Sequence, residues 1–134
     1  MEAQHPKESA ILVVEDDFLK ARLIVASLQN HIGTRKIHVA RDGDAAFRMI
    51  QEHDPDVILL NMNLSRPSGM EFLRLLSQDG NGMNETRIVA MTQLGQGDLR
   101  TAASTLGARY FVETPYAPAD LSSKIVEAIR GGRP

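Results

Sequence analysis

The chain has 134 residues, of which 43% are hydrophobic and 24% are charged, and its formal net charge at pH 7 is −2. This length suffices for one domain with its own hydrophobic core. Cysteine is absent, which excludes disulfides, thiolate catalysis and cysteine zinc sites. The charge provides no basic face for nucleic acid, and no apolar run approaches the roughly 20 residues that cross a bilayer. We therefore expect a cytoplasmic protein that binds neither nucleic acid nor membrane.

Short apolar runs alternate along the chain with longer amphipathic segments. Residues 1–9 are polar and lack the hydrophobic stretch of a secretory signal, so we interpret them as an N-terminal tail. The first half of the chain predicts strands at Ile11–Val14, Ile37–Ala40 and Asp56–Leu60, and helices from Phe18 to about His31, from Asp44 to about Glu52 and from Gly69 to about Gln78. A loop at Asp79–Asn84 follows. The second half predicts strands at Ile88–Thr92 and Tyr110–Val112, and helices from about Asp98 to Leu106 and from Pro118 to Ile129, with Gly131 after the end of the last helix.

Five strands that alternate with five helices predict an α/β fold. The expected architecture is a doubly wound, flavodoxin-like parallel sheet in strand order 2-1-3-4-5, with helices on both faces. In such a fold the carboxyl ends of the strands meet at one edge, where ligands bind. The candidate functional residues are therefore those at the ends of the strands: Glu15, Asp16, Asp17, Asn61, Thr92 and Thr114.

Four segments together resemble the response-regulator receiver family of two-component signalling: Val13–Asp17, Leu59–Leu64, Ala90–Thr92 and Tyr110–Pro115. The resemblance covers roughly residues 10 to 130. It implies an acidic pair that holds Mg²⁺, an aspartate that accepts a phosphoryl group from a histidine kinase, a hydroxyl residue and an aromatic residue that switch, and a lysine that pairs with the phosphoryl charge. On this chain the acidic pair falls on Glu15 and Asp16, the hydroxyl residue on Thr92 and the aromatic on Phe111. The resemblance also implies that the backbone carbonyl of Asn63 would be a further metal ligand.

The departures from the family pattern lie at the reacting positions. Asn61 stands where the phosphoacceptor aspartate is expected, Thr114 where the lysine is expected, and Ser65 where a proline is common, whereas Gly69 is kept. Phosphoryl transfer needs an ionised oxygen nucleophile and cations that neutralise the phosphoryl oxygens. A carboxamide has no charge, and a threonine cannot act as an ammonium group. We therefore expect an atypical pseudo-receiver with no catalytic residue, and not an enzyme.

The acidic run has a second interpretation, in which it caps the following helix and holds no metal. Without a lysine or a metal, Glu15 and Asp16 should repel each other and raise one of their pKa values. Thr92 and Phe111 can equally be residues at the edge of the core, because a switching role presupposes a phosphoryl group.

The functional expectation is a stand-alone receiver-like domain over residues 10–131, with no separate output domain, that signals by phosphorylation-independent protein–protein interaction. The family presents the face of its fourth helix, fifth strand and fifth helix, here with Leu99, Tyr116 and Leu121 as contacts. The partners would be signalling proteins, a histidine kinase or another regulator, or a second copy through the same face. The alternative is a conventional phosphorylated response regulator in a phosphorelay in which Asn61 is an engineered replacement. A phosphohydrolase is disfavoured because the segment after the third strand supplies no nucleophilic aspartate.

Overall fold

The computed structural model describes residues 9–32, 36–78 and 87–131, so the predicted loop at 79–84 and nearly all of the predicted tail at 1–9 lie outside the described residues. Five parallel strands form one sheet in the order β2-β1-β3-β4-β5, which confirms the predicted topology. The strands are Ala10–Val14 (β1), Lys36–Ala40 (β2), Val57–Asn61 (β3), Arg87–Gln93 (β4) and Tyr110–Thr114 (β5).

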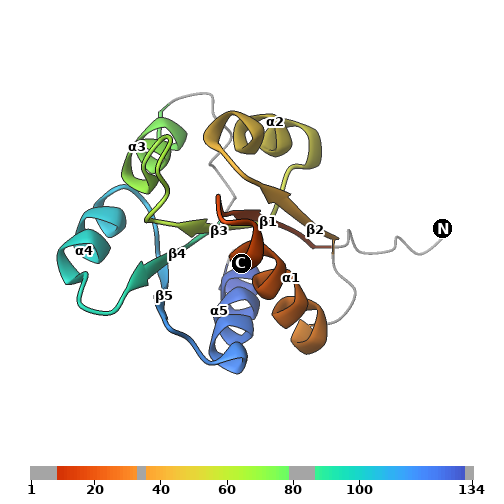
Figure 1. Ribbon diagram of the computed structural model, residues 1–134. Helices are drawn as coiled ribbons and strands as arrows, with labels where there is room; N and C mark the ends of the chain where they lie inside the picture. Colours follow the sequence, from red (N-terminus) through yellow and green to blue (C-terminus); the bar gives the residue numbers. More distant parts are fainter. Residues whose placement is uncertain (1–8, 33–35, 79–86, 132–134) are drawn as a thin grey trace.

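Helices cover both faces of the sheet, as Figure 1 shows. The helices are Phe18–Ile32 (α1), Gly43–His53 (α2), Gly69–Leu76 (α3), Gly97–Thr105 (α4) and Pro118–Gly131 (α5). Helices α1 and α5 pack side by side on one face, and α2, α3 and α4 lie on the other (Figure 1). Within the described segments, no helix has the length and apolar character needed to span a bilayer.

The sheet separates two hydrophobic clusters, because side chains along a strand point alternately to its two faces. In β1, for example, Leu12 and Val14 belong to the cluster under α2, α3 and α4, whereas Ile11 and Val13 belong to the cluster under α1 and α5. All four side chains are essentially inaccessible to solvent. A strand buried on both faces reads as a continuous apolar run, which is why its sequence predicted a strand without alternation.

Polar side chains fix where the helices begin. The Asp42 carboxylate accepts a hydrogen bond from the backbone N–H of Ala45 at 2.8 Å, and the Ser68 hydroxyl accepts one from the N–H of Glu71 at 3.1 Å. These are N-cap contacts, which satisfy N–H groups that have no partner within the helix. At the end of α4, Gly107 adopts a φ of +110°, a left-handed conformation that glycine tolerates best.

Two predicted boundaries differ from the structure in ways that matter. Strand β3 ends at Asn61 rather than at Leu60, because Asn61 pairs with Met91 of the neighbouring strand. The backbone of Asn61 therefore belongs to the sheet and not to a loop. Helix α5 continues through Gly131, so the prediction that this glycine follows the helix was wrong by a residue or two, which is the usual uncertainty of helix ends.

Two histidines stack at the edge of the sheet, a contact that their sequence spacing does not reveal. The ring centroids of His38, in β2, and His53, at the end of α2, are 3.8 Å apart with an interplanar angle of 11°. Burial lowers the pKa of His38, and the neighbouring His53 and Lys36 lower it further, because each of these effects disfavours the imidazolium form.

The lowered pKa of His38 predicts a loss of stability in mild acid. The unfolded chain binds the His38 proton more tightly than the folded chain, so the free energy of unfolding should fall as the pH drops below about 6.5 and level off below the folded pKa. The variant His38→Phe should show a smaller decrease in urea denaturation between pH 7.5 and pH 5. His31→Gln, at an exposed position on α1, should behave like the wild type, and equal slopes for all three proteins would contradict the assignment.

Candidate functional site

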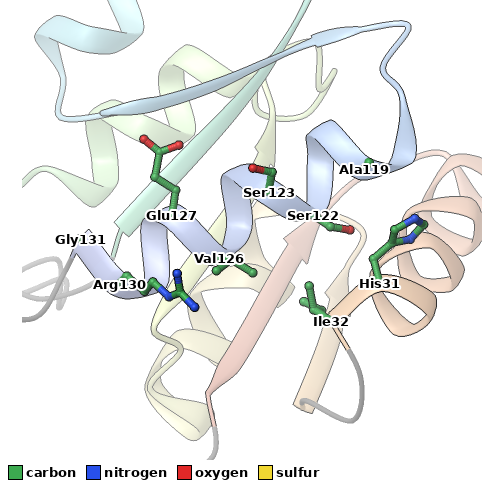
Figure 2. Close-up of a pocket in the computed structure, with 9 residues that line it drawn as sticks. All are labelled: His31, Ile32, Ala119, Ser122, Ser123, Val126, Glu127, Arg130 and Gly131. Atoms are coloured by element: carbon green, nitrogen blue, oxygen red, sulfur yellow. The ribbon is translucent and has the colours of Figure 1, made fainter.

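A cavity of about 390 Å³ lies at the carboxyl ends of the strands. Its lining includes seven residues that the sequence singled out, namely Glu15, Asp16, Asp17, Asn61, Asn63, Thr114 and Tyr116. Strands β1, β3 and β5 place them there, because parallel strands end at the same edge of the sheet. A second and larger hollow, of about 730 Å³, lies between α1 and α5, with lining side chains such as Ser122 and Arg130 (Figure 2). It shares no residue with the acidic cavity.

The side chain of Asn61 is hydrogen-bonded to the carboxylate of Glu15. Its Nδ2 group donates hydrogen bonds to both carboxylate oxygens of Glu15, each at 3.1 Å, and its Oδ1 accepts the backbone N–H of Asn63 at 2.9 Å. Glu15 is only 2% exposed, so its carboxylate needs such donors. An aspartate at position 61 has no N–H to offer and would bring a second negative charge to the same place.

The pKa of Glu15 is raised above its ordinary value, whereas that of Asp16 is lowered. Burial is the largest cause that raises the pKa of Glu15, and it outweighs the hydrogen bonds from the Asp17 N–H and from Asn61, while Asp16 raises it further. The sequence predicted a raised pKa from repulsion between the two carboxylates, and the direction is confirmed. The repulsion is nevertheless the smaller contribution, and desolvation is the main one.

Ser65 holds the second carboxylate. Its backbone N–H and its hydroxyl both donate to Oδ2 of Asp16, at 3.2 Å and 2.9 Å. Burial tends to raise the pKa of Asp16, but these two hydrogen bonds, together with those to Glu15 and to its own backbone, outweigh burial, so the pKa lies below its ordinary value. A proline at position 65 would have neither donor. The departure at position 65 therefore stabilises a charge in the pocket.

The third acidic residue acts as a helix cap. Oδ1 of Asp17 accepts the backbone N–H of Lys20 at 2.9 Å, and its carbonyl oxygen accepts the N–H of Ala21 at 2.9 Å. Asp17 thus caps the start of α1, as the second interpretation of the acidic run expected, and it lines the cavity together with Glu15 and Asp16.

A hydrogen bond connects Thr114 to Thr92. The Thr114 hydroxyl donates to the carbonyl oxygen of Thr92 at 3.3 Å. Thr92 is 2% exposed and does not line the acidic cavity, although it lies within β4 next to it. Among the described lining residues, the cationic side chain is that of Lys20 in α1, which the sequence did not indicate.

Phe111 lies under α4, away from the acidic cavity. Its ring packs against the hydrophobic cluster on that side of the sheet, and the guanidinium carbon of Arg100 lies 4.7 Å from the ring centroid. A cation over an aromatic face is an attractive contact. The ring is therefore covered on its outer side by a charged group.

Gln96 is a contact residue that the sequence analysis missed. Its side-chain amide pairs reciprocally with that of Asn63, with N···O distances of 3.0 Å and 3.1 Å. The residue stands between Gly95 and Gly97 in the turn from β4 to α4, and its composition signals only a turn. Only the fold shows that this turn lies against the end of β3.

The expected protein-contact residues differ in accessibility. Leu121 is completely buried in the cluster under α1 and α5, so its prediction as a surface contact was wrong. Its spacing with Ile125 and Ala128, one face of a helix, is the signal that would have assigned it to the core. Leu99 is partly buried, and Tyr116, which was expected to be exposed, is also partly buried. Tyr116 lines both the acidic cavity and a groove of about 520 Å³ formed by α4, β5 and α5.

Five parallel strands in the order β2-β1-β3-β4-β5, with an acidic pair at their carboxyl ends, are the arrangement expected of a receiver domain. Residues 11–126 match the model of the response regulator receiver domain, and the chain belongs to this family.

Among curated proteins, the chain is 29% identical over 120 residues to the phosphate regulon transcriptional regulatory protein PhoB of Klebsiella pneumoniae, covering 90% of this chain and 51% of that protein. It is 33% identical over 113 residues to a protein-glutamate methylesterase/protein-glutamine glutaminase of Koribacter versatilis, covering 84% of this chain and 30% of that protein. The chain thus spans about half of the length of the first relative and less than a third of the second.

Solved structures support the same fold. The receiver domain of NtrX from Brucella abortus has a TM-score of 0.80 at 24% identity, with 90% of this chain and 98% of that chain covered. A putative response regulator from Chloroflexus aurantiacus has a TM-score of 0.83 at 21% identity, with 92% and 99% covered.

Receiver domains typically bind Mg²⁺ at this acidic site, and hard cations require oxygen ligands. Here Asn61 turns its N–H groups toward Glu15, and Oδ2 of Asp16 is already held by Ser65. Within the described residues, no group of three or more His, Asp or Glu side chains is arranged to hold a metal ion. The side chains as arranged do not fit a divalent cation.

Proposed function

We propose that this receiver domain acts in signal transduction by binding protein partners without accepting a phosphoryl group. The observation that carries the proposal is the hydrogen-bonded contact between Asn61 and Glu15. The carboxamide is uncharged, is a poor nucleophile and already donates hydrogen bonds to Glu15. The Thr114 hydroxyl donates a hydrogen bond to the carbonyl oxygen of Thr92, and it cannot supply positive charge.

The contacts of Ser65 and Thr114 argue against an otherwise conventional regulator with one altered residue. Each of these two positions departs from the family pattern and makes its own hydrogen bonds in the pocket. Restoring an aspartate at position 61 alone would leave the site without a cationic partner.

The expected partners are signalling proteins, a histidine kinase or another regulator, or a second copy of the chain, in the cytoplasm. The groove of α4, β5 and α5 offers Arg100, Phe111 and Tyr116 to such a partner. Helix α1 offers further apolar area, because Phe18, Leu19 and Leu23 are 58%, 64% and 59% exposed. Exposed apolar side chains gathered on one helix are typical of protein-binding surfaces.

Incubation with a small-molecule phosphodonor and Mg²⁺, followed by intact-mass measurement, tests the proposal. We expect no phosphoryl adduct on the wild-type chain. The double variant Asn61→Asp/Thr114→Lys restores both the nucleophile and the cation and is the matched comparison, on which an adduct is expected. A stable adduct on the wild type would overturn the proposal.

A further inference from the structure

We infer that the hydrogen-bonded side-chain amides of Asn63 and Gln96, here called the amide latch, position helix α4. By positioning α4, the latch also holds Arg100 against Phe111 on the groove, and it does so without any change of charge at the acidic cavity. The inference concerns how the same site is regulated and rests on the proposed function. A partner would then meet a surface that is set by neutral hydrogen bonds and not by a phosphoryl group.

The latch is reciprocal. Nδ2 of Asn63 donates to Oε1 of Gln96 at 3.1 Å, and Nε2 of Gln96 donates to Oδ1 of Asn63 at 3.0 Å. Oε1 of Gln96 also accepts the backbone N–H of Gln93 at 2.7 Å. Each amide therefore uses both its oxygen and its nitrogen, which fixes its orientation.

The latch is connected to the acidic cavity on one side. The backbone N–H of Asn63 donates to Oδ1 of Asn61, and Asn61 in turn donates to Glu15. A continuous series of hydrogen bonds thus runs from the end of β1 through the end of β3 to the turn after β4. All of the linking side chains except Glu15 are neutral amides.

On its other side, the latch is connected to the groove. Gln96 is the N-cap residue of α4, and its side chain makes no capping bond because it is used by Asn63 and Gln93. Its carbonyl oxygen accepts the N–H of Arg100 at 3.0 Å, the first backbone hydrogen bond of the helix. Arg100 then covers the Phe111 ring, and both residues line the groove.

Neutral amides have a specific consequence for signalling. A coupling that depends on phosphorylation or Mg²⁺ requires a new charge at the site, and it is absent until that charge arrives. The Asn63–Gln96 pair needs no such event, and it does not titrate. The groove should accordingly remain in one state in metal-free buffer, with Arg100 on Phe111.

The test uses NMR on the unphosphorylated chain in EDTA. In Asn63→Ala and in Gln96→Ala we expect chemical-shift changes at the Phe111 ring and faster hydrogen exchange of the Arg100 backbone N–H, by about fivefold to tenfold, the size expected for the loss of a hydrogen bond. The double alanine variant should add little to either single variant, because both remove the same contact. Gln51→Ala, at an exposed position on α2, should leave both signals unchanged.

A reversed pair provides a rescue that a merely structural role would not predict. Asn63→Gln/Gln96→Asn keeps one long and one short amide, and it should return the Arg100 exchange rate toward that of the wild type. Unchanged Arg100 and Phe111 signals in both single variants, or fully additive effects in the double variant, would overturn the latch. That result would leave the proposed function standing, whereas an adduct on the wild type would remove the proposed function and leave the latch measurement intact.

Discussion

Replacing Asn61 by aspartate is expected to lower the free energy of unfolding by about 3 kcal/mol in metal-free buffer. The change removes two N–H donors from the buried Glu15 carboxylate and places a second carboxylate against it. Thr114 offers no positive charge to offset this repulsion. Urea denaturation of the two proteins in EDTA measures the difference.

The same variant should gain a response to Mg²⁺, because a new carboxylate at position 61 then lies against that of Glu15, beside Asp16, and a hard cation relieves their repulsion. Millimolar MgCl₂ should recover most of the lost stability in Asn61→Asp and should leave the wild type unchanged. Asn30→Asp, at an exposed position on α1 that does not line the cavity, is the control and should cost less than about 1 kcal/mol. An Asn61→Asp variant as stable as the wild type in EDTA would show that the contact with Glu15 contributes nothing.

Gly69→Ala is expected to destabilise the domain by about 3 kcal/mol, the upper part of the range for overpacking. A Cβ atom at Gly69 would lie 2.5 Å from Cα of Met62 and 2.7 Å from its carbonyl oxygen. Both are backbone atoms at the end of β3, so they cannot turn aside as the tip of a side chain can. Either α3 or the segment that carries Asn61 and Asn63 has to move.

Gly97→Ala is the matched control for this substitution. Gly97 is also the first residue of a helix, but a Cβ atom there would meet nothing within 4 Å. Its replacement should be neutral or should stabilise the domain by up to about 1 kcal/mol, since alanine restricts the unfolded chain. Thermal or urea denaturation of both variants gives the comparison, and similar effects at the two positions would refute the steric explanation.

The order of elements could be predicted almost completely from the sequence. Strand β1 reads as an unbroken apolar run because it is buried on both faces, and α5 begins where Pro118 suits the first turn of a helix. The end of β3 was less accessible, because Asn61 joins the strand only through its pairing with Met91 in β4. That pairing is a tertiary contact, which no local pattern encodes.

The candidate site could be predicted as a set of positions but not as a set of contacts. Backbone topology alone brings Glu15, Asn61 and Thr114 to one edge of the sheet. The direction of the Asn61 amide depends on which groups nearby can donate or accept, and that requires the neighbours in space. Gln96 and Ser65 act through such contacts, and their residue types are common in any loop.

Tyr116 lines both the acidic cavity and the groove of α4, β5 and α5, and its phenol is therefore a natural optical probe of both. The chain contains no tryptophan and two tyrosines, so emission excited at wavelengths that phenylalanine does not absorb comes from Tyr110 and Tyr116. Burial raises the pKa of the Tyr116 phenol, and the nearby Glu15 raises it further, so the ring already senses the charge of the cavity. Quenching of the Tyr116 emission would report the binding of a ligand in the acidic cavity or of a partner in the groove, and the measurement needs no attached dye.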